Sequence, residues 1–283
     1  MAKKYRVLIP IDKPQAAREL ITLGAAVARH YRGEAIALNI LLRSRQEMSQ
    51  LSSREVDTLL DEHNQLLKEY CRHTMELGIT VTPATVLSQW VQETILHEAR
   101  TRGANMVIMG WNKPPQTPGA VMGSILDKVA SQAPADVAVF RNRGLQDRKV
   151  LLSTAGGPES HLGAQIAAAL QNTWGAAVTL LHLVKTKEEM DKGRQILEDF
   201  SDRYRLKARR IIKTRENFTA GILEESKFHN LIIVGGSRVG IFSRMFSRTI
   251  PDKVVEQAES SVLITHRHGT LPFMTRFFGS RRP

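Results

Sequence analysis

The amino-acid sequence predicts an α/β protein made of two similar domains in tandem, and three observations support this. One pattern occurs twice, strand-like and helix-like segments alternate through both copies, and 283 residues suffice for two domains of ordinary size. Gly110 and Gly235 each end a short apolar run, and their spacing, 235 − 110 = 125, is kept by Asp127 and Asp252. Solenoid repeats have periods of only about 20–50 residues, so each copy should be a whole domain.

In the first copy, short apolar runs alternate with amphipathic stretches. Leu20, Leu23 and Val27, for example, follow helical spacing after a continuous apolar run that ends at Ile11. The expected strands are 5–11, 35–41, 81–86, 106–109 and 137–140, and the expected helices are 14–31, 55–77, 91–102 and 124–132.

The second copy shows the same alternation. Its expected strands are 150–153, 177–184, 208–213, 231–234 and 262–265, with helices at 162–170, 187–204, 219–227 and 251–258. Near-continuous apolar strands connected by helices are typical of a parallel sheet that is covered on both faces. The predicted fold is therefore two Rossmann-like, doubly wound domains, each a five-stranded parallel sheet with helices on both faces.

The domain boundaries follow from a polar segment between the copies. Residues 141–148 contain Gly144 and charges of both signs, as expected of a linker, so the predicted domains are 1–143 and 148–268. Residues 269–283 then form a basic, aromatic tail. It contains Phe273, Arg276, Phe277, Phe278, Arg281 and Arg282. Two interpretations stay open for it: a solvated or docked tail, or a contact to an anionic membrane surface.

Composition excludes several classes of protein. The net charge of +12 suits anionic partners, but no helix-turn-helix, zinc-finger or RNP-type motif accompanies it, so we expect no specific nucleic-acid binding. Apolar runs fall short of the roughly 18 residues that cross a bilayer. The single Cys71 excludes a disulfide framework. We therefore expect a cytoplasmic protein, at most peripheral to a membrane.

Ligands of doubly wound sheets bind where strands end, and this rule selects three segments. They are 10–12, the strand end near Ile40, and the loop that follows Gly110. This loop reaches a predicted helix start at Gly123 and Ser124, where backbone N–H groups favour an anion, and Lys113 adds positive charge. Taken alone, the loop is more typical of an ordinary glycine- and proline-rich surface loop with Ser124 as the helix cap.

These segments, in this order, resemble the universal stress protein family. Pro10-Ile11-Asp12 follows the first strand, Met109-Gly110 the fourth, and Gly123-Ser124 comes thirteen residues later; the resemblance covers 5–140 and again 148–266. It implies binding of ATP or a related adenine nucleotide, with or without Mg²⁺. By the resemblance, Asp12 meets the nucleoside or a metal, Ile11 and Ile40 flank the base, and Gly123 and Ser124 hold phosphates. The implied cofactor site is Pro10, Ile11, Asp12, Ile40, Met109, Gly110, Lys113, Gly123, Ser124 and Ile125.

Both copies depart from the family's loop, which has Gly, two residues, Gly, nine residues, Gly and Ser or Thr. In the first copy Lys113 replaces the second glycine. In the second copy Ala155 stands at the position of Asp12, and Arg238 and Arg248 replace two loop glycines. We therefore expect no cofactor in the second domain.

No catalytic or metal-ligating residues are predicted, and slow ATP hydrolysis is the most that the sequence allows. The leading hypothesis is a stress-protein-like regulator that binds an adenine nucleotide in its first domain. The alternative is a non-catalytic adaptor, since the second copy is similar to stress-protein regions attached to amino-acid permeases and cation transporters. The expected partners are then an adenine nucleotide and a membrane transporter or anionic membrane surface, and a homo-oligomer stays open.

Overall fold

The structure is a computed structural model. It describes all residues except 1–3, 14–16, 77, 112–121, 237–248 and 270–283, and it gives the backbone alone for 122–124. The sequence-predicted tail from residue 270 onward therefore lies outside the described residues.

The first repeat (residues 1–143) alternates strands and helices as expected. Its strands are β1 (Arg6–Ile11), β2 (Glu34–Leu42), β3 (Val81–Ser88), β4 (Met106–Gly110) and β5 (Asp136–Arg141). Its helices are α1 (Arg18–His30), α2 (Arg45–Gln50), α3 (Ser53–Cys71), the 3₁₀ turn η2 (Arg72–Thr74), α4 (Val91–Thr101) and α5 (Met122–Gln132).

The second repeat (residues 148–268) has the same order of elements. Its strands are β6 (Lys149–Ser153), β7 (Ala177–Val184), β8 (Ala208–Thr214), β9 (Leu231–Gly235) and β10 (Ser261–His266). Its helices are α6 (Pro158–Trp174), α7 (Met190–Tyr204), α8 (Phe218–Ser226) and α9 (Ile250–Gln257). Gly157 and Pro158 begin α6, and Gly175, with φ +67°, ends it in the left-handed conformation that suits glycine.

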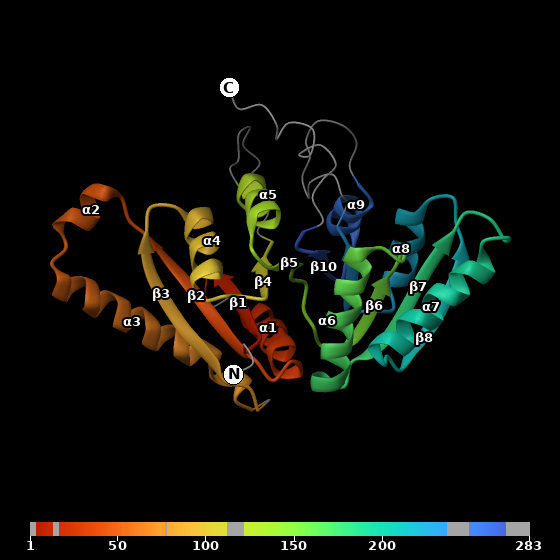
Figure 1. The fold of residues 1–283 in the computed structure, drawn as a ribbon, viewed down its shortest axis with the longest axis horizontal. Helices are drawn as coiled ribbons and strands as arrows, with labels where there is room; N and C mark the ends of the chain where they lie inside the picture. Colours follow the sequence, from red (N-terminus) through yellow and green to blue (C-terminus); the bar gives the residue numbers. More distant parts are fainter. Residues whose placement is uncertain (1–3, 14–16, 77, 112–121, 237–248, 270–283) are drawn as a thin grey trace, which may run out of the picture.

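Each repeat contributes five parallel strands, and the two sets join into one sheet. The strand order is β3-β2-β1-β4-β5-β10-β9-β6-β7-β8, and only the central pair, β5 with β10, is antiparallel. Val139 pairs with Ile264, which is its own counterpart at an offset of 125. A pseudo-twofold axis therefore passes through this pair, and the repeats lie side by side about it (Figure 1).

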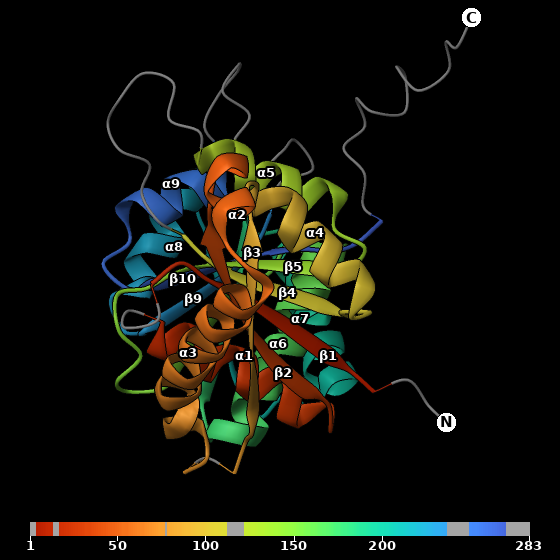
Figure 2. The ribbon, with the colours of Figure 1, turned by 90° about the vertical axis from the view of Figure 1, so that its left-hand side faces the viewer.

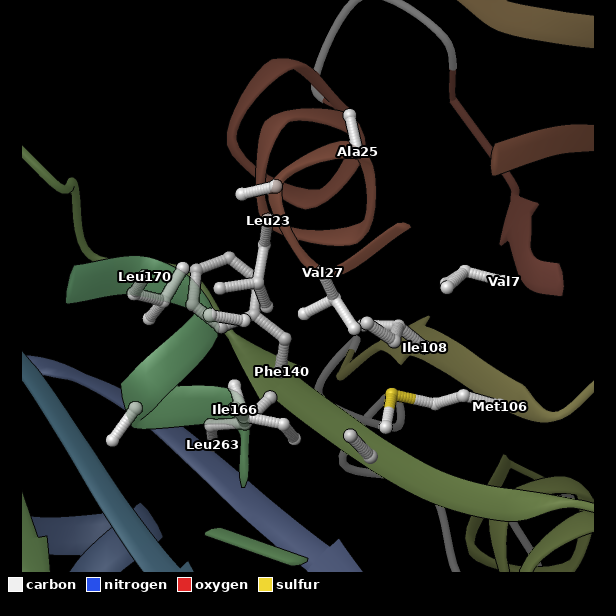
Figure 3. Packing of buried hydrophobic residues seen from close by; sticks show 14 of the residues in the cluster. Val7, Leu23, Ala25, Val27, Met106, Ile108, Phe140, Ile166, Leu170 and Leu263 are labelled. Atoms are coloured by element: carbon white, nitrogen blue, oxygen red, sulfur yellow. The ribbon is translucent and has the colours of Figure 1, made fainter. Parts of the chain in front are cut away.

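Helices cover both faces of the sheet across this seam. On one face α1 packs against α6, and on the other α5 and α9 lie near each other (Figure 1). The first core contains Leu23 of α1, Ile166 of α6, Phe140 of β5 and Leu263 of β10, all at most 1% exposed (Figure 3). The second core likewise joins Val139 to Ile264. Both cores cross the seam, so each repeat buries apolar surface against the other.

Arg141 ties the repeats together from the end of β5. Its side chain is 9% exposed, and its guanidinium donates to the backbone carbonyls of Val255, Ala258 and, at 3.0 Å, Ser260. These carbonyls belong to the end of α9 and the residues just after it, where a positive charge is favourable. The predicted linker 141–148 thus begins with a residue that is buried in the seam rather than solvated.

Two backbone bonds repeat the pseudo-symmetry at the seam. The N–H of Arg143 donates to Ser261 Oγ at 2.8 Å, and the N–H of His268, 125 residues later, donates to Asp136 Oδ1 at 2.8 Å. The first residue of β10 therefore accepts a hydrogen bond from the segment after β5, and the first residue of β5 accepts one from the segment after β10. His266 is the buried last residue of β10.

One expected helix differs clearly from the structure. The stretch 55–77 was expected to be one helix, but α3 ends at Cys71 and the 3₁₀ turn η2 follows. The short helix α2, which lies before α3, was not predicted. The capping boxes Ser44/Glu47 and Ser52/Glu55 begin α2 and α3. The other predicted elements agree with the structure to within a few residues at each end.

Candidate functional site

A cavity of about 310 Å³ lies at the carboxyl ends of the strands in the first repeat. It lies at the end of β1, which has β2 as its neighbour on one side and β4 on the other. The strand order reverses there, so this is the topological switch point of the sheet. Helices complete the walls: α1 contributes Leu20, α4 contributes Ile95, and α5 contributes Leu126, all of them buried. The walls are thus mainly apolar, as expected for a small-molecule site.

Polar groups line the same cavity. Asp12 and Lys13 follow β1, and Asn142 follows β5; all three are exposed. Asn142 is held in place, because its Nδ2 donates to Glu19 Oε2 at 3.1 Å and its Oδ1 accepts from the N–H of Gly144 at 2.9 Å. A carboxylate, an ammonium and an oriented amide beside apolar walls suit a ligand with an apolar part and a polar part.

The structure brings together seven of the ten site residues predicted from sequence. The seven that line the cavity are Pro10, Ile11, Asp12, Ile40, Met109, Gly110 and Ile125. Lys113 lies outside the described residues. Gly123 and Ser124 lie in the first turn of α5, where only the backbone is described, so their predicted contact with phosphate stays a prediction.

Sequence reasoning missed part of the wall. Phe140 and Asn142 belong to it because β5 is parallel to β4 and ends beside it, and the strand-end rule would have found them had it been applied to the fifth strand. Val91 and Ile95 face the cavity from α4, which requires knowing how that helix packs. Trp111 lines the cavity too, and its N–H donates to the carbonyl of Phe140 at 2.7 Å.

The corresponding place in the second repeat is built differently. By strand register, Val7 corresponds to Val150, an offset of 143, whereas Gly24 of α1 corresponds to Gly163 of α6, an offset of 139. The connection between strand and helix is therefore 143 − 139 = 4 residues shorter in the second repeat, so α6 begins nearer to its strand.

Glu159 shows the effect of this shortening. It takes the place of Leu20 and is 7% exposed. A Cβ placed on Gly235 would lie 2.9 Å from Glu159 Cβ, whereas one on Gly110 would lie 3.7 Å from Leu20 Cδ2. The helix thus approaches the strand end more closely in the second repeat, leaving less room there.

Other second-repeat positions also differ from the first. By the strand register, Ala155 is the counterpart of Asp12, so the second repeat has no carboxylate at this position. The hydroxyl of Thr249, the counterpart of Ser124, donates to Asp252 Oδ2 at 2.6 Å. Arg238 and Arg248 lie outside the described residues.

Comparison with known proteins assigns the first repeat to a family. Residues 5–141 match the model of the universal stress protein family. This part of the chain belongs to that family. The same fold extends through the second repeat, because its strand order, β8-β7-β6-β9-β10, corresponds to β3-β2-β1-β4-β5 of the first.

A sequence relative covers both repeats. The Na⁺/H⁺ antiporter NhaS5 of Synechocystis sp. is 27% identical over 279 residues, which is 93% of this chain and 38% of the antiporter. The chain therefore spans well under half the length of that relative. The matched region includes the second repeat, as the resemblance to transporter-attached regions predicted.

Solved structures share the fold of the whole chain. A universal stress protein from Archaeoglobus fulgidus has a TM-score of 0.61 at 13% identity, covering 93% of this chain and 96% of its own. The cytoplasmic domain of a prokaryotic cation chloride cotransporter also has a TM-score of 0.61 at 13% identity, covering 97% of this chain and 100% of its own. At such identities the likeness confirms the predicted fold alone.

Two further observations concern the described part of the chain. None of its helices is both long and apolar enough to cross a membrane. In the same residues, no three His, Cys, Asp or Glu side chains are grouped so that they could hold a metal ion.

Proposed function

We propose that the first repeat binds an adenine nucleotide in the cavity at its strand ends, and that the chain acts as a nucleotide-responsive regulator. The cavity itself is the main support, since it gathers seven predicted residues at the switch point of the sheet. In this proposal the base lies between the apolar strand ends near Ile11 and Ile40, and Asp12 accepts a hydrogen bond from a hydroxyl of the ribose. The phosphates lie toward the start of α5, since the N-terminus of a helix favours an anion.

The division of labour between the repeats is part of the same proposal. Residues 1–143 form the nucleotide-binding domain, and residues 148–268 form a second domain without a cofactor. The buried Glu159 and the shorter strand-to-helix connection support this assignment. We assign no catalytic residue.

Calorimetry with ATP tests the proposal directly. The variant Gly110→Ala adds a methyl group to the cavity wall, where its nearest neighbour would be Leu20 Cδ2 at 3.7 Å, an ordinary contact. The fold should therefore tolerate it, whereas overpacking of 1–3 kcal/mol should weaken ATP binding by about tenfold or more. An unchanged thermal transition is the fold control. Absence of binding by the unaltered protein at millimolar ATP would contradict the proposal.

A second candidate function is that of a regulatory module associated with a cation transporter. It is favoured because the relative that matches 93% of the chain is an antiporter. On this proposal the chain lies on the cytoplasmic side of a membrane and contacts a transporter. Cross-linking in cells followed by identification of the captured membrane protein tests it, and recovery of soluble proteins alone would contradict it.

A further inference from the structure

The two repeats differ most in the segment between their second and third strands. The paired residues Ala35 and Val81 are 81 − 35 = 46 positions apart, whereas the matched pair Val178 and Ala208 are 208 − 178 = 30 apart. The first repeat thus has 16 additional residues. The lengthened segment contains α2 and α3, and we call residues 45–66 of it the arm.

The arm is helical although it buries very little. α2 has no buried residue, and in the 19 residues of α3 only Leu67 and Cys71 are buried, both beyond the arm. Its helices instead begin at two capping boxes, each of which satisfies backbone groups locally. The arm lies at the far end of the molecule, and Figure 2 shows it in front of the sheet, away from the second repeat.

Apolar side chains remain accessible on this helix. Leu66 is 51% exposed, and Val56, Leu59 and Leu60 are only partly buried. Leu66 lies on a solvent-facing side of α3, together with Asp61, Glu62 and Glu69. An amphipathic helix whose apolar residues are not covered by its own fold is typical of a partner-binding element.

The charge of α3 indicates what kind of partner it fits. Residues 53–71 contain two basic and five acidic side chains, a net charge of 2 − 5 = −3, in a chain whose total is +12. Among the described residues, no lysine or arginine forms an ion pair with Asp57, Asp61, Glu62 or Glu69. These carboxylates would repel an anionic membrane surface, which leaves a protein as the complementary partner.

We propose that the acidic face of α3 is a docking site for a basic amphipathic helix of another protein. Leucines of that helix cover Leu66, and its lysines or arginines pair with Asp61, Glu62 and Glu69. This site is independent of the nucleotide cavity, because none of these four residues lines that cavity.

A designed peptide tests the site. The probe is an 18-residue fluorescent helix of leucine and lysine in amphipathic order, and the matched probe replaces every lysine by glutamate. We expect the lysine probe to bind and the glutamate probe not to bind. The double variant Asp61→Lys/Glu62→Lys should weaken binding by about tenfold, because each exposed pair contributes up to about 1 kcal/mol. Leu66→Ser should weaken it as well.

The control is an equal charge change on the equivalent helix of the other repeat. Asp199→Lys/Asp202→Lys alters two exposed residues of α7 and should leave peptide binding unchanged. An equal loss in both double variants would show that only overall charge matters and would overturn the proposal.

Two further measurements separate other occupants. Sedimentation of the unaltered protein tests for a second copy, and co-sedimentation with phosphatidylserine vesicles tests for lipid. Self-association or vesicle binding that Asp61→Lys/Glu62→Lys abolishes would assign the face to that occupant instead and overturn the proposal.

Discussion

Replacing Arg141 by methionine should destabilise the whole chain, because this one side chain joins the repeats. Methionine preserves the buried volume approximately but removes the donors to Val255, Ala258 and Ser260. Burial, and then the nearby positive charge of Arg143, lowers the pKa of Arg141, so its own desolvation offsets part of what the hydrogen bonds contribute. Bonds to a charged group contribute about 1.5–3 kcal/mol each, and we expect a net loss of about 3 kcal/mol after this offset.

The assay is thermal unfolding followed by circular dichroism and tryptophan fluorescence. A loss of about 3 kcal/mol corresponds to a fall in Tm of roughly 6–12 °C for a chain of about this size. Because both repeats share cores across the seam, the two probes should shift together. Arg141→Lys should recover part of the loss, since an ammonium still provides donors.

The matched control is Arg143→Met. Arg143 is exposed and contributes to the seam through its backbone N–H, which methionine retains. The control should change stability by less than about 0.5 kcal/mol. If Arg141→Met is no more damaging than Arg143→Met, the guanidinium does not hold the repeats together and the reasoning is wrong.

Four other outcomes are expected. Calorimetry should give one ATP per chain, and Ala155→Asp should leave that number at one, because Glu159 still occupies the space; a second ATP would contradict this. Burial lowers the pKa of His266 from its ordinary 6.5, although the negative charges of Glu159 and Asp136 oppose this shift, so the unfolded chain binds more protons than the folded one. The free energy of unfolding should therefore fall as the pH drops below about 6.5. His266→Asn should flatten this slope, whereas the control His97→Asn, at an exposed histidine, should not. Burial raises the pKa of the Cys71 thiol to about 11, so a disulfide reagent at pH 8 should label it slowly until urea is added; rapid labelling of the folded chain would refute this. Gly24→Ala should cost about 1–3 kcal/mol in urea unfolding, because its Cβ would lie 2.4 Å from Ile9 Cδ1; unchanged stability would show that α1 shifts freely.

Most of the fold could be predicted from sequence because its signals are local. Continuous apolar strands and helical stripes each depend on short stretches of chain, and the 125-residue offset is found by comparing two such stretches. The antiparallel seam could not be predicted in the same way. Nothing in β5 or β10 distinguishes an edge strand from a paired one, and Arg141 reads as linker until the end of α9 is placed beside it.

The candidate site shows the same division. Residues at strand ends, such as Asp12 and Gly110, follow from the strand-end rule once the strands are known. Leu20 and Ile95 required the packing of α1 and α4. The arm was partly hidden for a different reason: its leucines follow helical spacing as if buried, so the pattern predicts a helix without indicating that the fold leaves it uncovered.

The seam between β5 and β10 also has a consequence for synthesis on the ribosome. The partner of Val139 is Ile264, which is made 264 − 139 = 125 residues later. At about 5–20 residues per second, β5 waits roughly 6–25 s for the strand that completes its pairing. Through that interval the nascent chain carries an unpaired apolar edge, the kind of surface that pairs with neighbouring chains. Slow translation of the second repeat should therefore promote association between nascent chains, whereas in the completed protein β10 covers this edge of β5.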